Sequence, residues 1–86
     1  MVAQRLSVVV PALNEARGIA DALRALAPLR SRGHELIVVD GGSHDGTREI
    51  AAALADATIV APRGRARQMN AGARAARGDA LVFLHA

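Results

Sequence analysis

Short apolar runs, separated by helix-like segments, dominate the pattern of this chain. Four of them have the length of strands: Leu6 to Val10, Glu35 to Asp40, Ala57 to Val60 and Ala80 to Leu84. Each is nearly continuous in valine, isoleucine, leucine or another apolar residue, which is typical of strands buried on both faces of a sheet. We expect these runs to carry the hydrophobic core.

Helical patterns fill the intervals between the expected strands. We expect Pro11 to end the first strand and Asn14 to cap a first helix, which Pro28 then stops. For the second helix, either Ser43 or Asp45 can serve as the cap.

The third expected helix, Arg65 to Arg77, is rich in alanine, and Gly78 is its expected C-cap. Small side chains along one helix face predict close packing against a sheet. The residues on that expected face are Ala66, Met69, Ala73 and Ala76.

The order β-α-β-α-β-α-β predicts an α/β fold with a Rossmann-like parallel sheet, covered by helices on both faces through right-handed crossovers. Ligands of such sheets bind at the carboxyl ends of the strands. Segments 11–15, 40–46 and 85–86 are expected at that edge, and the loop 63–67 can reach it. Any binding site is therefore expected there.

The composition of the chain reduces the number of possible function classes. The chain has 86 residues, no cysteine and a net charge of +3, with every basic residue except histidine an arginine. Arginine suits bidentate phosphate recognition, although a GC-rich gene produces the same bias. With Phe83 as the one aromatic residue, the stacking platforms of a nucleic-acid binder are missing. No secretory signal and no apolar run of ~18 residues is present, so we expect a cytoplasmic protein without a membrane span.

Several common active-site motifs are absent from the sequence. It contains no G-x-G-x-x-G after the first strand, no P-loop, no G-x-S-x-G and no helical H-E-x-x-H. A polar group does stand where a ligand is expected, because Asp40 ends the second strand and precedes two glycines. Its carboxylate can accept hydrogen bonds from a ribose or a base, or it can cap its own loop. Both alternatives stay open, whereas Asp45 is assigned mainly to helix capping.

Four blocks together carry a resemblance to a known family: VVVPALNE from Val8, IVVDGGSHDGT from Ile37, GRARQMNAG from Gly64, and Gly78-Asp79 followed by ALVFLHA. In this order and spacing the chain resembles the nucleotide-sugar-binding half of family 2 glycosyltransferases. That family shows P-x-x-N-E, D-x-S-x-D-x-T, a small-residue helix with an asparagine, and G-[DE] before a strand ending in D-x-D. The resemblance implies a partial GT-A fold.

The resemblance also implies roles for single residues. Pro11, Leu13 and Glu15 would line the base and ribose pocket, and Asp40 would hydrogen-bond the base, most often uracil. A nucleoside diphosphate sugar, most often a UDP-sugar, would be the donor, and the acceptor is unknown.

At the diphosphate, Arg65 and Arg67 would approach from the start of the third helix, whose dipole favours an anion. Asn70 and Gly72 would hold that helix against the sheet.

One departure from the family concerns the metal. His85 stands where the first aspartate of D-x-D falls, and the second would come one residue after Ala86. The resemblance places His85 beside the ribose and the metal, and it implies Mn²⁺ or Mg²⁺ at the diphosphate, but the metal ligand set is incomplete in this chain. We name no catalytic residue.

We therefore expect residues 1–86 to be the nucleotide-binding half of a glycosyltransferase domain that continues further. By themselves they are expected to be inactive and prone to self-association through the exposed fourth strand. Two other classes remain open. A sugar-nucleotide nucleotidyltransferase would carry a Gly-rich, Arg- and Lys-bearing loop where this chain has PALNE. A non-enzymatic α/β binding module would bind acidic partners in a salt-dependent way.

Overall fold

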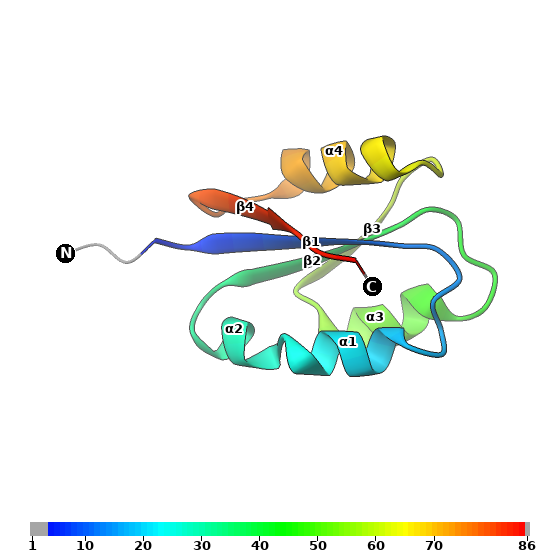
Figure 1. The fold of residues 1–86 in the computed structure, drawn as a ribbon, viewed down its shortest axis with the longest axis horizontal. Helices are drawn as coiled ribbons and strands as arrows, with labels where there is room; N and C mark the ends of the chain where they lie inside the picture. Colours follow the sequence, from blue (N-terminus) through cyan, green and yellow to red (C-terminus); the bar gives the residue numbers. More distant parts are fainter. Residues whose placement is uncertain (1–3, 86) are drawn as a thin grey trace.

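The computed structural model describes residues 4–85, which form three layers (Figure 1). A parallel sheet lies in the middle, helix α4 covers one face, and helices α1, α2 and α3 cover the other. The elements in chain order are β1 (Leu6–Ala12), α1 (Ile19–Ala25), α2 (Ala27–Ser31), β2 (Glu35–Asp40), α3 (Thr47–Leu54), β3 (Ala57–Val60), α4 (Arg65–Ala75) and β4 (Ala80–Phe83). The predicted α/β fold class is confirmed.

The strand order is β3-β2-β1-β4, so β1 and β2 are the two inner strands. Their register runs from the pair Ser7 and Glu35 to the pair Ala12 and Asp40. Every residue of β2 is buried. The order of the strands reverses at β1, because the chain first builds outward to β3 and then returns to place β4 on the other side. This makes the carboxyl end of β1 the switch point of the sheet.

The core consists of two layers, one on each face of the sheet. Alternate residues of β1 and β2 point to opposite faces. Val8, Val10, Leu36 and Val38 pack with Ile19, Leu23 and Ala51 on the side of α1 and α3. On the side of α4, Val9, Ile37 and Val39 pack with Ala61. The continuous valine runs thus report burial on both faces, as predicted.

The outer strands are less buried than their apolar sequences suggest. Among residues 4–85, β4 pairs only with β1. Leu81 and Phe83 keep 43% and 40% of their surfaces exposed. The expectation of a strand buried on both faces is therefore wrong for β4, which lies at the edge of the sheet among the described residues. The described part of the chain contains no helix long and apolar enough to cross a membrane.

Both prolines expected to end an element lie inside one. Pro11 is part of β1 and pairs in register with Val39. The carbonyl of Val9, two residues earlier, accepts a hydrogen bond from Leu84, so the nitrogen of Pro11 points to the same side, beyond the end of β4. Its missing N–H therefore costs no bond to β2. Pro28 lies in the first turn of the short helix α2, where a missing N–H is tolerated.

The predicted helix caps also need correction. Helix α1 begins only at Ile19, after Gly18, and Asn14 lies in the preceding loop with a φ of 51°. At α3 neither Ser43 nor Asp45 is the N-cap residue, because that place is taken by Gly46 with a φ of 91°. Asp45 lies one residue earlier, and its Oδ1 accepts the N–H of Thr47 at 3.2 Å. Ser43 bonds to other groups of the loop instead. The predicted cap residues are therefore wrong for both helices: glycines occupy the N-cap positions, and the polar residues predicted as caps bind neighbouring loop groups instead.

Helix α4 presents a different face to the sheet from the one predicted. Its buried residues are Gln68 and Gly72, while Ala66 is exposed. The helix approaches so closely that a Cβ on Gly72 would lie 2.3 Å from Cγ1 of Val9. This close approach explains the packing role expected for Gly72. Asn70, for which the same role was expected, is exposed. The helical spacing of alanines alone gave the wrong face, because Gln68 and Gly72 are the residues of α4 that are buried against the sheet.

Gly78 likewise serves a close approach and not a C-cap. Helix α4 ends at Ala75, and a Cβ on Gly78 would lie 2.6 Å from Oγ of Ser7 and 2.7 Å from the carbonyl oxygen of Arg5. The same Oγ accepts the N–H of Gly78 and donates to Oε1 of Glu35, which also accepts the N–H of Arg77. A buried polar cluster thus joins the start of the inner strands to the chain entering β4.

Replacement of Gly72 by alanine tests the close packing of α4. Alanine favours a helix over glycine by about 1 kcal/mol, but overpacking a well-filled site typically costs about 1–3 kcal/mol. With a contact of 2.3 Å to a strand side chain, we expect the second effect to win and the free energy of unfolding to fall by about 1–2 kcal/mol. Urea unfolding measures this. Gly18→Ala is the control, because no atom lies within 4 Å of its added Cβ, and a comparable loss there would contradict the interpretation.

Glu35 gives a test by pH. Burial raises the pKa of its carboxyl, but hydrogen bonds from Arg77 and Ser7 and the charges of Arg5 and Arg77 lower it, so that the pKa lies below its ordinary value of 4.5. A lowered pKa stabilises the fold above the unfolded-state pKa, and this stability is lost as the pH falls through the folded-state pKa.

We expect the free energy of unfolding to decrease as the pH is lowered below about 4.5. Glu35→Gln should remove part of this decrease, and it should cost about 1 kcal/mol of stability at neutral pH. Urea unfolding at about pH 7 and about pH 3 measures both effects. If the variant and the unchanged chain lost the same stability between the two pH values, Glu35 would not be the responsible group.

Candidate functional site

A cleft of about 260 Å³ opens at the carboxyl ends of the inner strands, where ligands of parallel sheets bind. It lies at the switch point, between the loop after β1 and the loop that leads into α4. The residues that line it are Pro11, Ala12, Leu13, Glu15, Arg63, Gly64, Arg65, Gln68 and His85. The structure thus brings together segments separated by more than 50 positions in the sequence.

Five of the seven residues proposed from the sequence line this cleft. They are Pro11, Leu13, Glu15, Arg65 and His85. Asp40 and Arg67 do not. Arg67 is exposed on α4, two positions after Arg65, and its aliphatic chain lies near Gly64. Gln68 was not proposed from the sequence at all.

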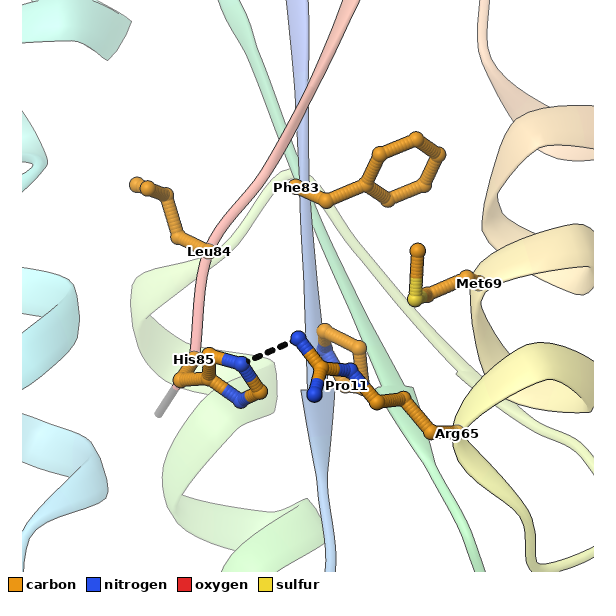
Figure 2. Close-up of a pocket in the computed structure, with 6 residues that line it drawn as sticks. All are labelled: Pro11, Arg65, Met69, Phe83, Leu84 and His85. Carbon is orange, nitrogen blue, oxygen red and sulfur yellow. Dashed lines mark hydrogen bonds between the residues drawn. The ribbon is translucent and has the colours of Figure 1, made fainter.

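Arg65 and His85 meet across the mouth of the cleft. Figure 2 shows the guanidinium reaching from α4 toward the imidazole, with Pro11 beside it, and Nη2 of Arg65 bonds to Nε2 of His85. A guanidinium only donates hydrogen bonds, so Nε2 of His85 is the acceptor of this bond. Phe83 on β4 and Met69 on α4 lie next to the pair (Figure 2). A positive charge therefore stands at the entrance, on an apolar support.

The wall that carries Arg65 is basic and turns sharply. Gly64 has a φ of 139°, a conformation that side chains rarely adopt, and it lets the chain turn from β3 into α4. Arg63 stands before this turn and also lines the cleft. Two arginines therefore line the cleft, Arg63 before the turn and Arg65 at the N-terminus of a helix of 11 residues. Such a wall favours anions.

Asp40 is fully buried and faces its own loop. Its Oδ2 accepts the N–H groups of Gly42 and Ser43 at 3.0 and 2.8 Å, and its Oδ1 accepts the hydroxyl of Ser43. Of the two alternatives for Asp40, the geometry supports loop capping. A carboxylate already bonded to three donors and shielded from solvent cannot present an oxygen to a base in this conformation, so the expected base contact has no support here.

Gln68 ties the cleft floor together. It is 5% exposed, and its Nε2 donates to the carbonyl oxygens of Ala12 and Val39 at 3.0 and 2.9 Å, while its Oε1 accepts the N–H of Gly64 at 3.2 Å. The side chain thus joins the ends of β1 and β2 to the loop that presents Arg65. The bonds use both N–H groups of the amide and its oxygen, as a buried polar group requires.

Two glycines give Gln68 its place. A Cβ on Gly41 would lie 2.8 Å from Oε1 of Gln68, so the glycine after β2 leaves room for the amide. Gly72 lies four residues after Gln68, on the same side of α4. A glutamine and a glycine at this spacing, in a helix otherwise rich in alanine and arginine, are the sequence signal that could have identified the sheet-facing side.

Removal of the Gln68 amide is expected to loosen this floor. Gln68→Ala leaves buried backbone groups without their partner, which typically costs about 1–3 kcal/mol in the free energy of unfolding. Asn70→Ala is the matched control, because it removes an exposed amide from the same helix and should change stability by less than about 0.5 kcal/mol. Urea unfolding of both variants measures the difference. Equal effects would show that Gln68 contributes no more than a surface amide.

The described residues do not by themselves form a metal site. Within 4–85, no three His, Asp or Glu side chains lie close enough together to hold a metal ion. Of these residue types, His85 and Glu15 line the cleft, on opposite sides of it. Nε2 of His85 is already bonded to Arg65. No chemical step through a metal can therefore be derived from these residues alone.

Comparison with known proteins identifies the class. The family model of glycosyl transferase family 2 matches residues 7–86. The chain therefore belongs to glycosyltransferase family 2, as the four sequence blocks predicted. Its fold is the corresponding part of the GT-A fold.

Particular relatives agree with this membership. Succinoglycan biosynthesis protein ExoA of Rhizobium meliloti is 48% identical over 52 residues, which cover 56% of this chain and 15% of ExoA. Glucosyl-3-phosphoglycerate synthase of Mycobacterium tuberculosis, solved with Mn²⁺, UDP and glucosyl-3-phosphoglycerate, is 30% identical with a TM-score of 0.85, over 95% of this chain and 33% of the synthase. Mannosyl-3-phosphoglycerate synthase of Rubrobacter xylanophilus is 25% identical with a TM-score of 0.82, over 96% and 30% of the two chains. This chain thus spans a third or less of each relative.

Proposed function

We propose that residues 1–86 are the nucleotide-binding half of a glycosyltransferase domain and bind the nucleoside diphosphate part of a sugar donor. The whole domain would transfer the sugar to an acceptor. The observation that carries this proposal is the cleft at the switch point, with Arg63 and Arg65 on one wall and Pro11, Leu13 and Glu15 on the other. Family membership gives the reaction class, and the cleft gives the place where the donor would bind.

The two walls suit the two ends of a nucleotide. Guanidinium groups form strong, charge-assisted hydrogen bonds with phosphate oxygens, so Arg65 and Arg63 would hold the diphosphate. The opposite wall offers apolar surface from Pro11 and Leu13 and one carboxylate, Glu15, which can accept hydrogen bonds from ribose hydroxyls. For Asp40 we propose an indirect role through its loop, since its carboxylate is turned inward.

UDP is the nucleotide that we propose, because the synthase of similar fold was solved with UDP. The same synthase was solved with Mn²⁺ and with Mg²⁺, which agrees with the divalent metal that the family resemblance implies. When bound, such an ion would offset charge on the diphosphate. For His85, which lines the cleft, we propose a place on the ribose side and no bond to the ion.

The second part of the proposal is self-association through the edge strand β4. Within residues 4–85 the outer side of β4 pairs with no strand, and the side chains of Leu81 and Phe83 are exposed. An exposed apolar edge strand is a template for pairing with another chain.

A nucleotide titration of the chain tests the proposed function. UDP, GDP and CMP are titrated by calorimetry with and without Mn²⁺, and we expect UDP to bind most tightly. Arg65→Ala should weaken UDP binding about 10- to 100-fold, because a hydrogen bond to a charged group contributes about 1.5–3 kcal/mol. Arg74→Ala is the control, since it removes an exposed arginine from the other end of α4 and should change the Kd by less than about twofold.

The opposite result identifies the alternative. Equal, weak and salt-sensitive binding of all three nucleotides, with the same loss in both arginine variants, would reject nucleotide recognition. It would favour the non-enzymatic module that binds acidic partners through its overall charge.

A further inference from the structure

Two hydroxyl groups, one from the loop after β2 and one from the first residue of α3, hold the loop after β1. Oγ of Ser43 accepts the N–H of Asn14, and Oγ1 of Thr47 accepts the N–H of Glu15, each at 2.8 Å. The two N–H groups belong to consecutive residues of the cleft-lining loop. Their direction, and therefore the course of the chain between Leu13 and the start of α1, is fixed by these bonds.

Each hydroxyl is oriented by a carboxylate. Ser43 donates its single hydroxyl hydrogen to Asp40, and Thr47 donates its own to Asp45. With the hydrogen committed to a carboxylate, only the lone pairs of the oxygen remain, and these face the N–H groups of the other loop. We call the pairs Asp40–Ser43 and Asp45–Thr47 the acid–hydroxyl pairs. Charge-assisted bonds of this kind are about twice as strong as neutral ones.

Two further bonds close the contact between the loops. Oδ1 of Asn14 accepts the N–H of His44 at 2.9 Å, and Oδ2 of Asp45 accepts the N–H of Ala16 at 3.1 Å. Asn14 has a φ of 51°, a left-handed conformation that other side chains adopt only at a cost. Bonds in both directions between the loops maintain this conformation.

Burial makes the contact hard to replace by water. Asp40 and Thr47 are completely buried, although the loops they serve are at the surface. The hydrogen bonds that Asp45 accepts, the one from the Thr47 hydroxyl first, lower the pKa of its carboxyl below the ordinary value of 3.8. The Asp45–Thr47 pair therefore keeps its charge at neutral pH.

We propose that Ser43 and Thr47 are positioning residues that preform the nucleoside wall of the cleft. Leu13 and Glu15 are the residues of the held loop that line the cleft, and Ser43 and Thr47 themselves do not line it. Because the loop is already ordered, a ligand does not have to order it on binding. Each backbone residue that must be ordered costs about tenfold in affinity. This inference rests on the proposed function for its ligand, but not for the contact itself.

The test combines Thr47→Val, which keeps the shape of the side chain and removes the hydroxyl, with Thr47→Ser, which restores it. Thr58→Val is the matched control: within residues 4–85, Oγ1 of Thr58 is buried and makes no hydrogen bond. Amide hydrogen exchange of the isotope-labelled chain reports the N–H of Glu15 against that of Val9 in β1, and calorimetry reports the Kd for UDP. Ser43→Ala with Asn14 as reporter repeats the test at the less buried pair, should Thr47→Val not fold.

We expect Thr47→Val to speed the exchange of Glu15 at least tenfold relative to Val9 and to raise the Kd for UDP at least tenfold. Thr47→Ser should restore both values, and Thr58→Val should change neither. A faster exchange of Glu15 with an unchanged Kd would overturn the proposal, as would an equal rise of the Kd in Thr58→Val. If the unchanged chain bound no UDP, the proposed function would fail, while the exchange rates would still decide whether the hydroxyls hold the loop.

Discussion

The parallel pairing of β1 with β2 is the constraint on which the rest of the described structure depends. Six residue pairs, from Ser7 with Glu35 to Ala12 with Asp40, align the two strands, and both faces of the pair are buried. Backbone groups of such strands satisfy one another along the ladder. Beyond the last pair no partner strand remains, so polar groups at each end need another source of hydrogen bonds, because an unpaired buried group costs about 1–3 kcal/mol.

Side chains supply those bonds at both ends of the pair. At the amino end, Ser7 and Glu35 bind the backbone that enters β4. At the carboxyl end, Gln68 binds the carbonyl oxygens of Ala12 and Val39, and Asp40 binds the loop that follows it. The cleft opens at the carboxyl end of the strand pair. The side chains that bind the backbone there also set the shape of the cleft.

Function in this arrangement is divided between groups that face the cleft and groups that hold them. Arg63, Arg65 and Glu15 reach the cleft, whereas Gln68 fixes the basic loop from below. Within the described structure, Asp40 and Asp45 of the IVVDGGSHDGT block, which resembles the family, bind backbone and hydroxyl groups of their own segment. A motif that resembles a ligand-binding signature is, in this structure, largely a device for positioning its neighbours.

The sequence by itself determined the α/β class, the order of the elements, the edge at which the cleft lies and five of its lining residues. Continuous valine runs, turn-forming glycines and the four family blocks are local signals, and they do not depend on how distant segments meet. Only the tertiary structure decided that Pro11 continues β1, that α4 faces the sheet with Gln68 and Gly72, and that Asp40 turns inward. The first two depend on partners far away in the sequence, at the end of β4 and at the side chain of Val9, whereas Asp40 is held by its own loop, in which Ser43 accepts the N–H of Asn14. Where the sequence leaves two possible roles for a buried residue, its contacts in the folded chain decide between them. Burial leaves a polar group no water to bind instead.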